Sequence, residues 1–198
     1  MVMTARDGDQ MDATDDDSAA APILVTGFGA FPGVPDNPSE RFARSVHGQI
    51  VAGRAIVGRV LPVEWRRAWP ALLEAVDTHR PIALLMYGVA RHRTQVEVER
   101  VARNRTAARV DAVGELPPAE HVLPDAPDAL LTTLPWRALT GPHVGTSDNA
   151  GDYLCNYVMF RSVHALCNHV PHCGFVHMPE HETPGAHAVL TRLSRLLR

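Results

Sequence analysis

The sequence predicts an α/β fold: a three-layer α/β/α sandwich around a mostly parallel mixed sheet, in a single domain. Apolar, strand-like runs alternate along the chain with helical patterns, which is typical of layered α/β proteins. The length of 198 residues suits about one domain. Hydrophobic residues make up 45% of the chain, enough to build a substantial core.

Residues 1–20 differ in composition from the rest of the chain. They carry six aspartates and one arginine, a charge of −5, whereas the whole chain carries −3 and the remainder therefore +2. The segment has neither aromatic residues nor hydrophobic periodicity. We expect a disordered acidic tail over 1–20 and the folded domain over 21–198.

The elements of the domain follow from hydrophobic period and turn signals. Runs that are continuously apolar or that alternate predict strands over 22–28, 54–63, 82–88, 94–101, 144–147 and 174–178. Period and capping residues predict helices over 38–47, 65–77, 152–170 and 184–197. The first of these helices has Asn37 as its N-cap and Pro38 in its first turn. Residues 111–145 are rich in proline and predict few regular elements.

Composition also bears on partners and location. The small net charge does not indicate a nucleic-acid partner, and no apolar run approaches the ~20 residues of a membrane span. The acidic start lacks the basic region of a secretory signal, and three cysteines make no disulfide framework. The glycines of 27–29 lack the third glycine of a dinucleotide fingerprint. We therefore expect a cytoplasmic protein without cofactor, nucleic-acid partner or membrane contact.

A candidate nucleophile lies in the segment SDNAGDYLCN (147–156). A glycine turn precedes a helix that starts near Asp152, so Cys155 falls in the first helical turn. The positive end of a helix lowers the pKa of a thiol, and the thiolate is the reactive form. Free cysteines are more often small buried hydrophobes, which is how we interpret Cys167 and Cys173.

A base and an orienting acid complete the candidate set. His177 lies near the carboxyl end of a predicted strand, where α/β folds place their sites, and a cysteine nucleophile needs such a partner. With eleven histidines in the chain, a structural role is the ordinary alternative. Glu97 and Glu99 alternate on one strand face, so either could orient the imidazole.

Taken together, four ordered segments resemble the pyroglutamyl peptidase I (pyrrolidone-carboxylate peptidase) family of cysteine peptidases. They are VTGFGAFPG (25–33) with NPS (37–39), GVARHRTQVEVERVARN (88–104), SDNAGDYLCN (147–156) and GFVHMP (174–179). The resemblance runs from about Ile23 to the C-terminus and includes one candidate residue in each of three segments.

The resemblance implies an omega-peptidase that removes N-terminal pyroglutamate (5-oxoproline) from peptides through an acyl-enzyme. It implies Cys155 as nucleophile, His177 as base and Glu99 as third member, because Glu99 opens the matching ERVA-x-N block. It implies no metal, and it makes a homo-oligomer, often a tetramer, an expectation. The positions that it assigns to substrate binding are Phe28, Phe31, Arg109, Val110, Tyr153 and Leu154.

Departures from the family pattern motivate two alternatives. Arg91 and His92 replace a Gly-Gly pair, Asp152 replaces a hydroxyl residue, and 139–145 is shorter than usual. One alternative is therefore a family member that binds without cutting. The other is a zinc protein, although the spacings of its candidate ligands match no common zinc pattern. Those candidates are His164, Cys167, His169, His172, Cys173 and His177.

Overall fold

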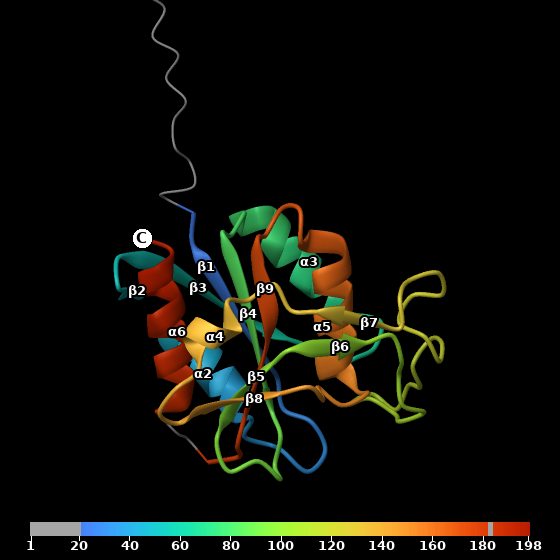
Figure 1. Cartoon of the computed structure of the whole chain (residues 1–198). Helices are drawn as coiled ribbons and strands as arrows, with labels where there is room; N and C mark the ends of the chain where they lie inside the picture. The colour runs from blue at the N-terminus through green and yellow to red at the C-terminus, as the bar shows by residue number, and fades with distance from the viewer. Residues whose placement is uncertain (1–20, 182–183) are drawn as a thin grey trace, which may run out of the picture.

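The computed structural model describes residues 21–181 and 184–198, so the predicted tail over 1–20 lies outside the described residues. A seven-stranded sheet with the order β2-β3-β1-β4-β9-β5-β8 forms the centre of the domain (Figure 1). Its strands are β1 (Ile23–Phe28), β2 (Ile50–Val51), β3 (Arg54–Leu61), β4 (Ala83–Val89), β5 (Val96–Glu99), β8 (Val144–Ser147) and β9 (His172–Met178).

The sheet is mixed and mostly parallel, as predicted. Strand β1 runs parallel to β3 and β4, β4 parallel to β9, and β5 parallel to β8. The antiparallel pairs are β2 with β3 and β5 with β9. The β5–β9 pair sets Glu97 opposite His177.

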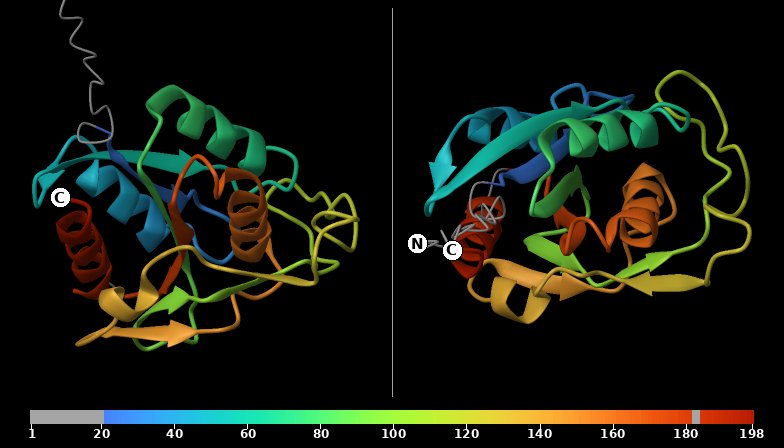
Figure 2. Two further views of the ribbon diagram at one scale, coloured as in Figure 1. Left: turned by 45° about the horizontal axis from the view of Figure 1, so that its top comes forward. Right: turned by 90° about the horizontal axis from the view of Figure 1, so that it is seen from above.

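Helices cover both faces of the sheet and confirm the three-layer prediction (Figure 2). One face carries α2 (Pro38–Val46) and α6 (Gly185–Leu196), and the other carries α3 (Ala68–His79) and α5 (Leu154–Leu166). The short helix α4 (Trp136–Leu139) packs beside α6. The described residues contain no helix of the length and apolarity that crossing a membrane requires.

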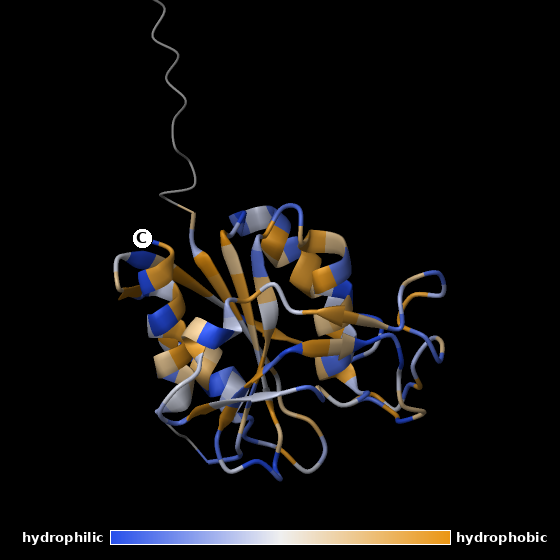
Figure 3. Cartoon of the chain, viewed as in Figure 1, coloured by the Kyte–Doolittle hydropathy of each residue, from blue (hydrophilic) through white to orange (hydrophobic). Residues whose placement is uncertain are grey.

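Alternation along the central strands fills the two cores, and these strands are the apolar centre of the molecule in Figure 3. On β4, Leu84 and Met86 face α3 and α5, whereas Leu85 and Tyr87 face α2 and α6. On β9, Phe175 faces the α3–α5 side. Because side chains alternate along a strand, His177 points to this same side, toward α5.

The junction between β1 and α2 is fixed by the NPS segment. Asn37 caps α2 by accepting a hydrogen bond from the Ser39 N–H, and its amide donates to the Gly29 carbonyl. The Phe28 N–H donates to Ser39 Oγ. A Cβ on Gly27 would lie 1.9 Å from the Ser39 carbonyl oxygen, so only glycine allows this close approach.

Several element boundaries differ from those predicted. The alternating stretch 94–101 is interrupted at Arg100 and continues as β6 (Val101–Arg103), which pairs with β7 (Ala129–Leu131) in a separate two-stranded sheet. Helix α5 ends at Leu166 rather than near 170. Cys167 is consequently exposed beyond the helix, so its interpretation as a core cysteine was wrong, whereas Cys173 is buried.

Candidate active site

A cavity of about 330 Å³ opens at the carboxyl ends of β1, β4 and β9, beside the start of α5. This is the edge at which parallel α/β sheets gather functional groups. The cavity is lined by Phe28, Phe31, Asn37, Val63, Val89, Ala90, Arg91, His92, Arg93, Arg109, Asn149, Ala150, Gly151, Asp152, Tyr153, Leu154, Cys155 and His177.

Cys155 is the second residue of α5, as the sequence predicts. Gly151 adopts a φ of +79° in the turn before the helix, a conformation that favours glycine. The Cys155 sulfur packs over Gly88 of β4, where a Cβ added to the glycine would lie 2.9 Å from Sγ. Gly88 is the register partner of His177. The thiol therefore lies over the strand position next to the imidazole.

Burial dominates the acid–base character of this thiol. It raises the pKa of Cys155 to about 12, with a further contribution from the negative charge of Glu99. The backbone N–H of Cys155 and the positive charges of Arg93 and Arg109 oppose this rise without reversing it. The expectation that the helix start lowers the thiol pKa was wrong, because desolvation outweighs the helix end at this depth. The Cys155 thiol is therefore neutral near pH 7.

His177 lies against Glu99, and both side chains are buried. The Nδ1 atom of His177 is 2.7 Å from Glu99 Oε1. Burial lowers the pKa of His177, although the Glu99 carboxylate acts against this effect. For Glu99, burial acts to raise the pKa, but the hydrogen bond from His177 and the nearby Arg93 keep it below its ordinary value. The pair therefore rests as a carboxylate and a neutral imidazole.

Arg93 is a residue of the site that sequence reasoning missed. Its Nη2 lies 2.8 Å from Glu99 Oε1 and 3.0 Å from Ser147 Oγ, and its Nη1 pairs with Glu97. Glu97 thus binds Arg93, while Glu99 contacts both Arg93 and the imidazole. An arginine six residues before the predicted acid was the available signal, but its contacts depend on the loop between β4 and β5.

Five of the six residues expected to bind substrate line the cavity. Phe28, Phe31, Arg109, Tyr153 and Leu154 line the cavity. The Arg109 guanidinium lies 4.6 Å from the Tyr153 ring centroid.

Val110 does not line the cavity. The residue is 52% exposed, and its carbonyl oxygen accepts a hydrogen bond from the hydroxyl of Tyr153, which does line the cavity. The structure therefore gives the Val110 side chain no place in the cavity wall.

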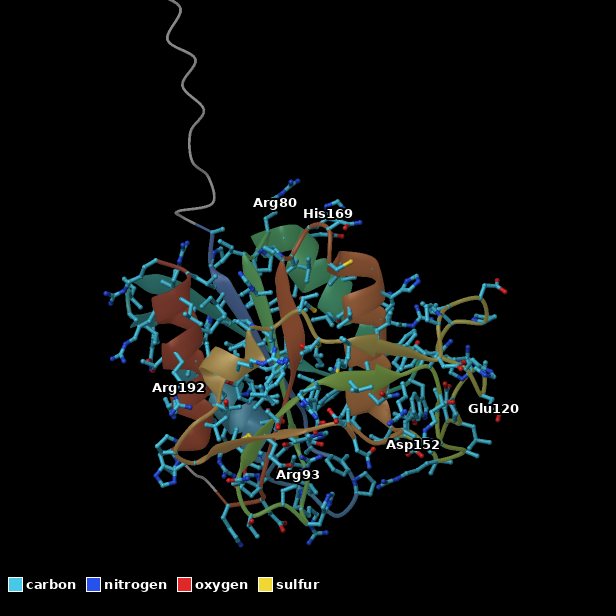
Figure 4. All side chains as sticks on the ribbon, viewed as in Figure 1. Arg80, Arg93, Glu120, Asp152, His169 and Arg192 are labelled. Carbon is cyan, nitrogen blue, oxygen red and sulfur yellow. The ribbon has the colours of Figure 1, made fainter. Side chains whose placement is uncertain are left out.

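The positions that depart from the family pattern lie at the cavity mouth. Arg91 is exposed and forms an ion pair with Glu180, and His92 is exposed beside it. Asp152 lies in the loop just before α5 (Figure 4) and also lines the cavity. It does not cap the helix, since the N-cap position is Tyr153 and no side chain bonds there. These departures change the rim and leave the buried residues in place.

The candidate zinc ligands do not form a metal site. Among the described residues there is no group of three or more histidine, cysteine or acidic side chains placed to hold a metal ion. His169 lies at the opposite end of the molecule from Arg93 (Figure 4), and Arg93 lines the cavity. His164 stacks on Phe160, and His177 is bonded to Glu99.

Comparison with known proteins identifies the family of the chain. A family model described as pyroglutamyl peptidase matches residues 21–185. The pyrrolidone-carboxylate peptidase of Deinococcus radiodurans is 37% identical over 169 residues, which are 79% of this chain and 77% of that protein. The enzyme of that name from Pyrococcus furiosus is 36% identical over 166 residues, covering 79% and 80% of the two chains.

Solved structures show the same fold. A mutant pyrrolidone carboxyl peptidase from P. furiosus superposes with a TM-score of 0.81 at 29% identity, covering 88% of this chain and 98% of the other. The pyrrolidone carboxyl peptidase from Thermococcus litoralis gives 0.80 at 30% identity, covering 89% and 92%. The chain belongs to the pyroglutamyl peptidase family of cysteine peptidases.

Proposed function

We propose that this protein hydrolyses the bond after an N-terminal pyroglutamyl residue, with Cys155 as nucleophile, His177 as general base and Glu99 as the acid that orients the base. The observation that carries the proposal is the shared cavity of Cys155 and His177, with His177 Nδ1 held 2.7 Å from buried Glu99. Relatives named pyrrolidone-carboxylate peptidase support the substrate class.

The charge states of the site suit a general-base mechanism. With Nδ1 bonded to Glu99, the neutral imidazole has Nε2 as its proton acceptor. Nε2 takes the thiol proton as Cys155 Sγ attacks the pyroglutamyl carbonyl carbon, and Glu99 stabilises the imidazolium that forms. The imidazolium then protonates the leaving amine, and the C–N bond breaks. Water, deprotonated by the same imidazole, hydrolyses the thioester and releases 5-oxoproline.

The start of α5 supplies donors for the oxyanion of this reaction. The first N–H groups of a helix have no acceptor within the helix, and α5 has no side-chain N-cap. Because Cys155 is the second residue of α5, these groups lie beside the reacting sulfur. Donors of this kind stabilise the negative charge that develops on the carbonyl oxygen.

The cavity wall suits a compact neutral ring. Phe28, Phe31 and Leu154 provide apolar contact surface. Among the described residues of the lining, three are arginines and one, Asp152, is acidic. Such a wall disfavours the ammonium group of an ordinary N-terminus, which is absent once the terminal residue has cyclised.

The test is release of a reporter amine from a pyroglutamyl conjugate, compared with the corresponding prolyl conjugate. We expect the wild type to cleave only the pyroglutamyl compound and Cys155→Ala to cleave neither. Cys167→Ala is the matched control, because Cys167 is exposed and outside the cavity. An inactive wild type that still binds the conjugate would favour the binding-only alternative, and activity in Cys155→Ala would exclude Cys155 as the nucleophile.

A further inference from the structure

The Arg93 side chain is buried between the two glutamates of β5. It is 9% exposed, while the side chains of Glu97 and Glu99 are 22% and 0% exposed. Nη1 pairs with Glu97, and Nη2 lies 2.8 Å from Glu99 Oε1. One guanidinium thus neutralises two carboxylates on the same strand face, which would otherwise raise each other's pKa.

The same guanidinium reaches the loop that leads to the nucleophile. Nη2 of Arg93 donates to the Asn149 carbonyl at 3.0 Å. Asn149 Oδ1 in turn accepts a hydrogen bond from the Gly151 N–H, in the turn before α5 and Cys155. Arg93, at the lower end of the sheet in Figure 4, therefore joins the acid's strand to the nucleophile's loop.

We propose that Arg93 is a positioning residue that keeps Glu99 charged and bonded to His177 while it fixes the loop that carries Cys155. The inference rests on the proposed function and deepens it, because it names a group that helps His177 to keep the acid charged. Arginine is suited to this task, since its planar fork bonds several acceptors at once, whereas lysine presents a single ammonium.

The direction of the pH effect follows from the groups that face Glu99 and the base. The groups around them come from β5, β9, α5, the loop between β4 and β5 and the loop between β6 and β7. They are Glu97, His177, Cys155, Arg93, His92 and Arg109. Loss of the Arg93 charge raises the pKa of both Glu99 and His177. Less of the enzyme then has a charged acid and a neutral base in mildly acidic solution.

The experiment compares the pH profile of kcat/KM for Arg93→Met, Arg93→Lys and the control Arg100→Met. Arg100 pairs with the exposed Asp148 at the surface, outside the cavity, so its loss should leave the profile unchanged. We expect Arg93→Met to lower kcat/KM roughly tenfold or more near pH 6, with less loss at higher pH. Arg93→Lys retains the positive charge but not the planar fork. It should therefore keep the acidic limb of the profile, where kcat/KM falls as the pH decreases, near that of the wild type, but it should lower kcat.

A second carboxylate substitution separates charge from folding. Glu97→Gln in the Arg93→Met background should move the acidic limb back toward lower pH, because one of the two repelling carboxylates is gone. Glu97→Gln alone should move the acidic limb of the profile to a lower pH than in the wild type. This single variant tests the inference even if Arg93→Met does not fold.

Two results would overturn the inference. One is an acidic limb that does not move in Arg93→Met, whatever the loss of kcat, since that marks a merely structural role. The other is a limb that Glu97→Gln leaves unmoved in either background. A wild type that does not hydrolyse the pyroglutamyl conjugate would instead refute the proposed function, so the two failures are distinguishable.

Discussion

At the scale of single residues, the site is defined by the balance between burial and charge at His177. Burial lowers its pKa and the Glu99 carboxylate acts in the opposite direction, which leaves a neutral imidazole ready to accept a proton. Burial of Cys155 makes its thiol a weak acid. Catalysis in the proposed mechanism therefore depends on stabilising the imidazolium that forms during the reaction, which is the task of Glu99.

Glu99 and Glu97 can be separated by paired substitutions. We expect Glu99→Gln to lower kcat/KM roughly tenfold or more, a loss of at least ~1.4 kcal/mol of transition-state stabilisation, because an amide cannot stabilise the imidazolium. Glu97→Gln should cost much less at neutral pH, since Glu97 contacts Arg93 and not the imidazole. Both variants are assayed on one pyroglutamyl substrate, with folding checked by circular dichroism. Equal losses would contradict the assignment of Glu99.

At the scale of elements, the site depends on how closely α5 approaches β4. Gly88 lies on the face of β4 that α5 covers, at the position paired with His177. The absent side chain makes room for the Cys155 sulfur and the Phe175 ring. Because the glycine has no side chain, the first turn of α5 can pack directly on the backbone at the end of β4.

Gly88→Ala tests this packing. The added Cβ would lie 2.7 Å from Phe175 Cζ and 2.9 Å from Cys155 Sγ, so the sulfur or the ring must move. We expect kcat/KM to fall roughly tenfold or more from misplacement of the thiol, together with a stability loss of about 1–3 kcal/mol from overpacking. The control is Gly29→Ala, whose Cβ would have its nearest neighbour at 3.7 Å. Similar kinetics for Gly88→Ala and wild type would show that the sulfur tolerates displacement.

At the scale of the whole molecule, the sheet order assembles the site from distant segments. Strand β9, the last in the chain, lies between β4 and β5, which brings His177 beside both Gly88 and Glu97. The buried charges gathered there couple folding to pH. Because the pKa values of His177 and Glu99 are both lowered by folding, the unfolded chain binds more protons in acid.

Stability should therefore fall as the solution becomes acidic. The contribution of His177 is present above the unfolded histidine pKa of about 6.5 and is lost as pH falls through its lower folded pKa. The contribution of Glu99 is lost further down, below about pH 4. We expect the melting temperature of His177→Gln to depend less on pH than that of the wild type between about pH 7 and pH 5. Parallel curves would show that His177 does not contribute to this slope.

Chelation distinguishes the thiol mechanism from the zinc alternative. A cysteine nucleophile needs no metal ion, and no three of the candidate ligands of 164–177 are grouped to hold one in the part of the chain that the structure describes. We expect incubation with EDTA to leave hydrolysis of the pyroglutamyl conjugate unchanged. Loss of activity that added zinc restores would contradict this prediction.

The sequence by itself determined the layered fold, because apolar period and turn residues are local signals. It placed the strands that flank the site, the cap at Asn37 and the position of Cys155 in the first turn of α5, all of which the structure confirms. The family resemblance chose Glu99 over Glu97, and the structure places Glu99 against the imidazole. Period alone could not choose, because both glutamates face the same side of β5.

Only the tertiary structure decided the properties that depend on burial and on contacts between distant residues. The raised pKa of Cys155 depends on the depth of its pocket, a property that spacing along the chain does not encode. The contacts of Arg93 with Glu99 and Asn149 need the segment 93–99 and the loop before α5 to meet. The exposure of Cys167 follows from the last turn of one helix. The first two features arise from packing between segments far apart in sequence, and local pattern carries no information about the distances between such segments.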